Sequence, residues 1–81
     1  MTRLEALRRQ KGYSLTDAAV ASELDRTTVF RVEKLIVKPR RSTIIQLAHG
    51  LKVSSKRLWD LAQADWADKV LAEHDGREPA A

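Results

Sequence analysis

The chain has 81 residues and a formal net charge of +4, a length that suits one domain with a modest core and leaves no room for a separate ligand-sensing domain. It contains no cysteine, which excludes a disulfide framework and a thiolate metal site. No apolar run approaches the length of a membrane span and no signal peptide opens the chain, so we expect a soluble, cytoplasmic protein with no membrane partner.

The charge is divided unevenly along the chain. Residues 1–59 hold thirteen basic and five acidic side chains, a balance of +8, whereas residues 60–81 hold two basic and six acidic ones, a balance of −4. A cluster of Lys and Arg displaces counterions from a phosphate backbone, which favours nucleic-acid binding. A charge excess alone is also consistent with a solvated charged surface. A motif within the basic part is needed to choose between that surface and a nucleic-acid-binding one.

The first predicted helix covers about residues 2–11, buries Leu4 and Leu7, and ends at Gly12, because glycine commonly terminates a helix. The next segment, residues 12–33, reads GYSLTDAAVASELDRTTVFRVE. Its pattern predicts two short helices joined by a tight turn, an arrangement that places side chains in the major groove of DNA.

Polar caps begin both helices of this pair. Ser14 is the predicted N-cap of the first, in which Ala18, Ala19 and Ala21 let another helix approach closely, and Asp25 caps the second. In the second helix one face carries an apolar pair spaced three residues apart, Val29 and Val32. The other faces carry Arg26, Thr27, Phe30, Arg31 and Lys34.

Residues 34–41 form a predicted loop with an apolar centre at residues 35–37, and Pro39 does not fit a helix interior. Ser42 caps a fourth helix, and Ser54 caps a fifth in which Leu58 and Leu61 point inward. This fifth helix either continues past Leu61 or is followed by a sixth. No alternating run predicts a strand, and the ending GREPAA is expected to be disordered. The apolar residues of the fourth helix recur at helical spacing: Ile44, Leu47, Ala48 and Leu51.

This pattern resembles the DNA-binding domain of the lambda-repressor-like, or Xre-like, family of bacterial and phage regulators. Ala19 matches a small residue of the motif's first helix, and Leu24 matches the apolar residue of its turn. Val29 and Val32 match the buried pair of the recognition helix, and Glu33 matches the acidic residue that ends it. The segment PRRSTIIQLAHGLKVSSKRLWDL, residues 39–61, is similar to the two helices that complete that domain. The resemblance implies an all-α, lambda-repressor-like five-helix domain over residues 1–61. Residues 62–81 then form a C-terminal helical extension and tail.

Each polar residue of the recognition helix has an expected role on DNA. Arg26, the first residue after the cap, is the candidate for a bidentate contact to guanine O6 and N7, worth about 1 to 3 kcal/mol of discrimination. Thr27 suits a base edge or a thymine methyl, and Arg31 reaches a base or the backbone. Thr28 bonds a phosphate or simply starts the helix, and Lys34 meets a phosphate.

Two acidic positions bear on these roles. The alternative for Arg26 is a surface ion pair with Asp25 or Glu23, an interaction that contributes little. Glu33 would repel phosphate if it faced DNA. We therefore expect Glu33 to have a structural role with an arginine of the first helix.

Lys38, Arg40 and Arg41 form a second basic cluster just before the fourth helix. Exposed N–H groups at helix starts attract phosphate, so the starts at Ser14 and Ser42 are candidate clamps on the two strand backbones. The resemblance implies that Arg41, and with it Arg40, reaches a phosphate or the minor groove. For Arg40 the alternative is a basic loop that contacts nothing in particular.

Four residues depart from the family pattern. Glu23 stands where the turn usually carries glycine, and a left-handed backbone there costs roughly 1 kcal/mol. Ser22 replaces a large apolar residue. Leu15 replaces a polar residue, often glutamine, that family members use on DNA. Phe30 occupies a groove-facing position where smaller residues are common; it either touches thymine methyls or covers the edge of the core, and we favour packing.

The chain beyond residue 61 is the expected dimerisation segment. Trp59, Trp66 and Val70 fall near one face if the helix continues, and tryptophan is enriched at interface anchors. A two-fold pair would set two recognition helices roughly 34 Å apart on a palindromic operator. The alternatives are that both tryptophans complete a monomer core, or that the apolar loop at residues 35–37 is the interface.

An enzyme is not expected. His49 and His74 are the only histidines, and neither has a partner at metal or triad spacing. The sequence also lacks a glycine-rich phosphate loop. We therefore predict no catalytic residue, no metal and no cofactor.

The interpretation is a small transcription regulator, a homodimer that binds a specific duplex operator in a bacterial or phage-infected cell and blocks or recruits polymerase. As a single domain it most resembles phage Cro-type repressors and the controller proteins of restriction-modification systems; the segment SELDRTTVFRVE is similar to the controllers in particular. Two alternatives stay open. One is a DNA-binding antitoxin whose acidic tail docks a protein toxin. The other is a protein-interaction module that keeps the fold without reading DNA, which Leu15 and Glu23 favour and Arg26, Arg31 and Arg41 oppose.

Overall fold

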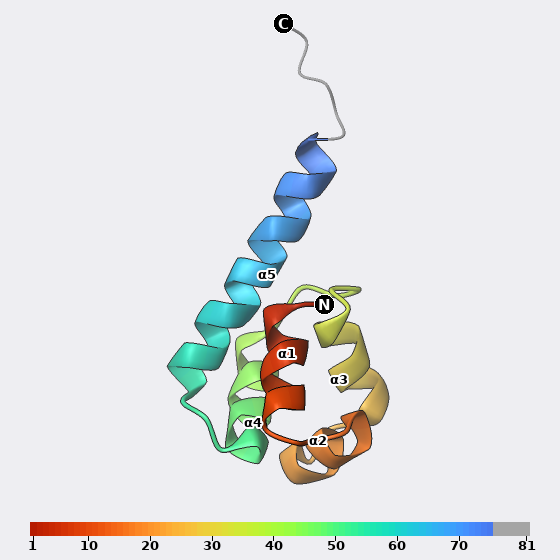
Figure 1. The fold of residues 1–81 in the computed structure, drawn as a ribbon, viewed down its shortest axis with the longest axis vertical. Helices are drawn as coiled ribbons and strands as arrows, with labels where there is room; N and C mark the ends of the chain where they lie inside the picture. The colour runs from red at the N-terminus through yellow and green to blue at the C-terminus, as the bar shows by residue number, and fades with distance from the viewer. Residues whose placement is uncertain (76–81) are drawn as a thin grey trace, which may run out of the picture.

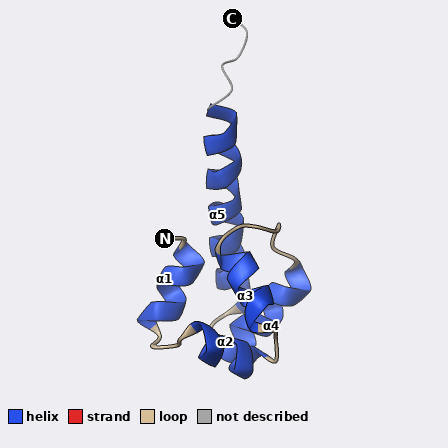
Figure 2. Cartoon of the chain, turned by 90° about the vertical axis from the view of Figure 1, so that its right-hand side faces the viewer, coloured by secondary structure: helices blue, strands red, loops and turns tan. Residues whose placement is uncertain are grey.

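The computed structural model describes residues 1–75, and every regular element in that range is a helix (Figure 2). The predicted all-α fold with five helices is confirmed. The ending GREPAA lies outside the described residues. In chain order the helices are α1 (Arg3–Gln10), α2 (Leu15–Ser22), α3 (Arg26–Glu33), α4 (Arg41–Leu51) and α5 (Ser55–Asp75).

Hydroxyl side chains begin three of these helices. Thr2 Oγ1 caps α1. At the start of α2, Ser14 Oγ accepts a hydrogen bond from the Asp17 N–H at 3.0 Å, while the Asp17 carboxylate accepts one from the Ser14 N–H at 3.1 Å. Ser54 Oγ caps α5 by accepting the N–H three residues further on at 3.3 Å. The predicted caps at Ser14 and Ser54 are confirmed, and each pairs an N–H that the helix backbone leaves free.

The start of α4 differs from the prediction. Arg40, rather than Ser42, occupies the N-cap: its backbone is extended and its carbonyl accepts the Ile44 N–H at 3.0 Å. This start leaves both Pro39 and Ile44 buried, which favours it because burial of apolar side chains is stabilising. Ser42 is exposed within the first turn. Asp25 does occupy the N-cap of α3, but its side chain makes no capping hydrogen bond.

The tight turn between α2 and α3 adopts the predicted left-handed conformation at Glu23, with φ 56° and ψ 40°. The Glu23 N–H donates to the Val20 carbonyl at 3.2 Å, and the Leu24 N–H donates to the Ala19 carbonyl at 2.9 Å. These two bonds pair the last carbonyls of α2 and reverse the chain within three residues. They fix α3 against α2 although a residue with a β-carbon occupies the strained position.

Helices α2 and α4 cross closely at Ser22 and Gly50. A Cβ placed on Gly50 would lie 2.7 Å from Ser22 N and 2.8 Å from the backbone carbon of Ala21, so the crossing requires glycine. Ser22 Oγ is buried here with no hydrogen-bond partner among the described residues. The predicted close approach to α2 therefore occurs, with Ala18 and Ala19 buried but Ala21 exposed.

The core lies where all five helices converge (Figure 1). It contains the residues predicted from periodicity on each helix, while Leu61 is only partly buried against it. These apolar side chains hold α3 on one face alone, which leaves its other faces open to solvent. The buried apolar residues are Leu4, Leu7, Ala18, Ala19, Val29, Val32, Ile44, Leu47, Ala48, Leu51, Leu58 and Ala62.

Helix α5 is one continuous helix of 21 residues. It runs through Leu61 without a break, and its second half extends beyond the other four helices (Figure 1). Within residues 1–75 no sixth helix follows. The Asp65 carboxylate accepts hydrogen bonds from the N–H groups of Arg3 at 2.9 Å and Leu4 at 3.1 Å. A side chain of α5 thus caps the start of α1, a contact that the sequence did not predict.

Candidate nucleic-acid interface

A buried ion pair anchors the end of α3 to α1. Arg8 Nε and Nη2 donate to the two carboxylate oxygens of Glu33 at 2.5 and 3.1 Å, and Arg8 Nη1 donates to the Tyr13 carbonyl at 2.7 Å. The hydrogen bond to Glu33 raises the pKa of Arg8. The predicted partner of Glu33, an arginine of the first helix, is therefore confirmed. One guanidinium joins α1, the segment leading into α2 and the last turn of α3.

A second buried carboxylate, that of Glu5 on α1, binds cations at the same end of α3. The buried Glu5 carboxylate accepts hydrogen bonds from Lys34 Nζ at 3.1 Å and Arg9 Nη2 at 2.9 Å. The bond from Lys34 is the main reason that the pKa of Glu5 is lowered. Lys34 thus has a partner within the domain. Its role as a phosphate ligand stays a prediction, and a phosphate bound there would share the Lys34 ammonium group with Glu5.

The outward faces of α3 carry the residues predicted to read DNA. Arg26, Thr27, Phe30 and Arg31 are exposed, and Thr28 is half-buried. None of the residues that the structure describes forms an ion pair with Arg26 or Arg31. The alternative that Arg26 pairs with a neighbouring acid of the turn is therefore not seen.

Between α3 and the start of α4 lies a basic depression of about 280 Å³. The recognition helix contributes Thr28 and Arg31, and the following loop contributes Lys38 and Arg40. Thr43, in the first turn of α4, completes the lining with a hydroxyl that the sequence reasoning missed. Its only sequence signal is its position beside the helix start. Three cations and two hydroxyls around one concavity form a surface that suits phosphate oxygens.

A smaller depression of about 230 Å³ lies on the α2 side of α3. Leu15, from the first turn of α2, lines it with Arg26, Thr27 and Phe30. Phe30 keeps 41% of its surface exposed, so it is covered only in part and the rest of its surface faces solvent. The two concavities divide the polar residues of α3 into a side beside α2 and a side beside α4.

The remaining predicted residues lie at helix starts. Arg41 begins α4, and its guanidinium carbon lies 5.4 Å from the centroid of the Trp59 ring, a cation–π contact between α4 and α5. Ser14 is exposed, but its hydroxyl already serves the α2 cap. The N–H of Ser14 lowers the pKa of Asp17, so a phosphate at this helix start would approach a carboxylate.

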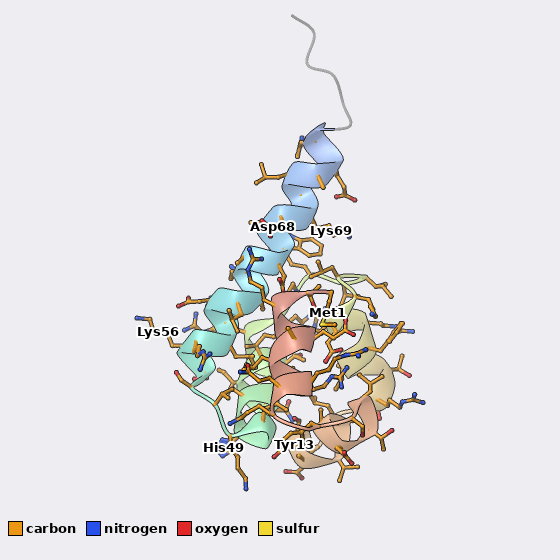
Figure 3. The ribbon with its side chains drawn as sticks, in the orientation of Figure 1. Met1, Tyr13, His49, Lys56, Asp68 and Lys69 are labelled. Carbon is orange, nitrogen blue, oxygen red and sulfur yellow. The ribbon has the colours of Figure 1, made fainter. Side chains whose placement is uncertain are left out.

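A lysine of α5 holds the loop after α3. Lys69 Nζ donates to the Leu35 carbonyl at 2.8 Å and lies 4.8 Å from the Trp66 ring centroid. Leu35 adopts a left-handed φ of 59°, which is strained for a residue with a β-carbon. Figure 3 shows Lys69 beside Asp68 and near Met1, with Lys56 at the other end of α5. Sequence reasoning missed this contact, which spans 34 positions of the chain.

The predicted dimerisation residues differ in their surroundings. Trp59 packs against the monomer core, as the alternative interpretation holds. Trp66 and Val70 are half-buried in the second half of α5. In the rival loop, Ile36 and Val37 are exposed.

Residues 1–75 hold no group of His, Cys, Asp and Glu side chains that is arranged to bind a metal ion. None of the helices in that range has the length and hydropathy needed to cross a membrane. His49 is exposed on α4 (Figure 3), and His74 is exposed near the end of α5.

A tight helix-turn-helix whose second helix presents exposed cations beside a basic loop defines a DNA-binding domain. A family model described as helix-turn-helix matches residues 4–58. No curated protein and no solved structure matches the chain. The protein belongs to this helix-turn-helix family, the Xre-like or lambda-repressor-like one that the sequence resembles, and it is a DNA-binding helix-turn-helix regulator.

Proposed function

We propose that the protein is a sequence-specific transcriptional regulator that binds a palindromic duplex operator as a homodimer in the bacterial cytoplasm, with α3 in the major groove. One observation carries this proposal: apart from Lys34, which bonds to Glu5, the exposed cations of α3 and of the segment after it make no ion pair with any described carboxylate. They can bind phosphates or base edges without first breaking an ion pair, although Arg41 also lies over the Trp59 ring. These residues are Arg26, Arg31, Lys38, Arg40 and Arg41.

The positions of the residues on α3 separate reading from positioning. Arg26 and Thr27 lie in the first turn of α3 and are assigned to base edges, Arg26 to a guanine. Arg31 lies one turn further on and shares the basic depression with Thr28, so it contacts the backbone or a base beside it. Contacts to phosphate fix the register of the protein on the duplex and carry little sequence information. They are assigned to Ser14, Thr28, Lys34, Lys38, Arg40 and Arg41.

The second half of α5 supports the homodimer. Trp66 and Val70 are half-buried there and Leu71 is 60% exposed, and this half of the helix extends beyond the other four helices (Figure 1). Pairing of two copies along this stretch would bury a tryptophan anchor. It would also present two copies of α3, which an operator reads at half-sites roughly 34 Å apart.

The test is selection of bound duplexes from a randomised library near physiological salt, followed by sequencing. Enrichment of a palindrome with half-sites about one helical turn apart supports the proposal. Binding without enrichment would mean a non-specific electrostatic contact, and no binding would contradict a DNA-reading role.

Three variants then separate the assigned roles on the selected operator. Arg26→Ala should relax the preference at one base pair, a loss of about 1 to 3 kcal/mol of discrimination. Lys38→Ala should weaken all duplexes alike and reduce the salt slope by about 0.9. Arg57→Ala removes one positive charge from exposed α5 and controls for net charge. If Arg26→Ala, like the control Arg57→Ala, kept the base preferences of the wild type, the assignment of Arg26 to a base would be wrong.

A further inference from the structure

The smaller depression beside α3 combines apolar and base-reading side chains. Leu15 and Phe30 provide its apolar lining, and Arg26 and Thr27 provide its polar lining. On α3 the spacing of three and four residues places Arg26, Thr27 and Phe30 on one side of the helix. Leu15 reaches the same depression from the first turn of α2. Among the described residues no carboxylate lines it, so none of the side chains that form the depression repels DNA.

The exposure of Phe30 requires an explanation. Leu15 is half-buried and packs against the core, whereas Phe30 leaves 41% of its surface in solvent on the face that the proposed function directs at the major groove. An aromatic ring held there beside a leucine gains by covering apolar surface on a ligand. The floor of the major groove offers one apolar group, the C5 methyl of a pyrimidine.

We propose that Leu15 and Phe30 form a pocket for the C5 methyl of a pyrimidine, while Arg26 binds a guanine at the neighbouring step. This inference rests on the proposed function and names a base that the operator contains. The methyl belongs either to thymine or to 5-methylcytosine, since both present the same group at the same place in the groove. The pocket makes the base step specific, because an unmethylated pyrimidine leaves the ring of Phe30 without its apolar partner.

The experiment removes the methyl and leaves the protein unchanged. In the operator obtained by selection, each thymine is replaced in turn by deoxyuridine, which lacks the C5 methyl, and each cytosine by 5-methylcytosine. Affinity is measured for the wild type, Phe30→Ala, Leu15→Ala and the control Lys38→Ala. Helix content and the urea midpoint establish that each variant is folded.

At one position of each half-site, removal of the methyl should weaken binding of the wild-type protein about four-fold. This factor corresponds to about 0.8 kcal/mol for one buried methyl-sized group. Phe30→Ala and Leu15→Ala should reduce this ratio towards one, and Lys38→Ala should keep it. A response to the thymine methyl identifies ordinary DNA as the source, and a response to 5-methylcytosine alone identifies methylated DNA.

Two results would overturn the pocket. One is a wild-type protein that binds methylated and unmethylated duplexes equally at every position. The other is a Phe30→Ala variant that keeps the full ratio. If the selection returned no operator, the proposed function would fail and the pocket with it; if it returned an operator that is indifferent to methyl groups, only the pocket would fail.

Discussion

Replacement of Glu33 by Gln is expected to destabilise the fold by about 3 to 5 kcal/mol, because it leaves the Arg8 guanidinium charged and buried without its counter-ion. Arg8 is 7% exposed and Glu33 is 2% exposed, so water cannot replace the carboxylate. The bond from Arg8 Nη1 to the Tyr13 carbonyl, at 2.7 Å, holds the guanidinium in place and keeps it from turning outward. A domain of this size has a total stability of roughly 5 to 15 kcal/mol, so the variant should be close to unfolding.

Urea unfolding followed by circular dichroism measures this loss. With a slope of about 1 to 3 kcal/mol per molar urea, the midpoint should fall by at least about 1 M. Asp68→Asn is the matched control, because Asp68 pairs with Arg3 at 2.7 Å but is 62% exposed. Its removal should leave the midpoint almost unchanged, since exposed ion pairs contribute little.

The reasoning would be refuted if Glu33→Gln shifted the midpoint no further than Asp68→Asn. A second pair of changes checks the cause of the loss. Arg8→Met combined with Glu33→Leu removes both charges and fills the space with apolar atoms, so it should recover most of the lost stability. If the double variant were as unstable as Glu33→Gln, packing rather than the unpaired charge would explain the effect.

Three further predictions follow from other contacts. Glu5→Gln should make stability depend less on pH in acid, because the bond from Lys34 lowers the pKa of Glu5 from its ordinary value of 4.5. The contribution of Glu5 to stability is therefore present above about pH 4.5 and is lost as the pH falls through the folded-state pKa. Urea midpoints of the variant that matched the wild type across this range would contradict the prediction. Lys69→Met should speed amide exchange in the loop after α3, and Lys56→Met, which removes the same charge at the other end of α5 (Figure 3), should not; equal exchange in both would show that the loop does not depend on Lys69. Gly50→Ala should lower the thermal midpoint by several degrees, because overpacking costs about 1 to 3 kcal/mol, and an unchanged midpoint would mean that α2 and α4 separate freely.

The helix-turn-helix motif could be predicted from the sequence because its signals are local. Ser14 and Asp17 stand three residues apart and form the capping box without help from the rest of the chain. Val29 and Val32 are spaced for one buried face, and both are buried. The left-handed backbone found at Glu23 follows from the resemblance, because the family pattern usually carries glycine at this position of the turn.

The rest depends on contacts between distant residues. Ser42 carries the stronger capping signal, yet α4 begins one residue before it, a start that leaves both Pro39 and Ile44 buried. Asp65 caps α1 from a position 61 residues away, and Thr43 joins the basic depression only once α4 lies beside α3. Neither the spacing of apolar residues nor a capping residue can predict such contacts, because predicting them requires knowledge of which helices are neighbours.

The positive charge on the exposed surface of α3 and of the segment after it depends partly on where the acidic residues lie. Of the five acids in residues 1–59, Glu5 and Glu33 are buried in ion pairs and Asp17 closes the α2 cap. Glu23 and Asp25 occupy the turn and pair with no described cation. The buried carboxylates therefore stabilise the packing of α1 against α3 and, by the same placement, stay away from phosphate. A substitution that releases Glu33 from Arg8 consequently acts on stability and on the charge of the DNA-facing surface at once. On α3 and in the segment after it, the cations that make no ion pair with a described carboxylate are Arg26, Arg31, Lys38, Arg40 and Arg41.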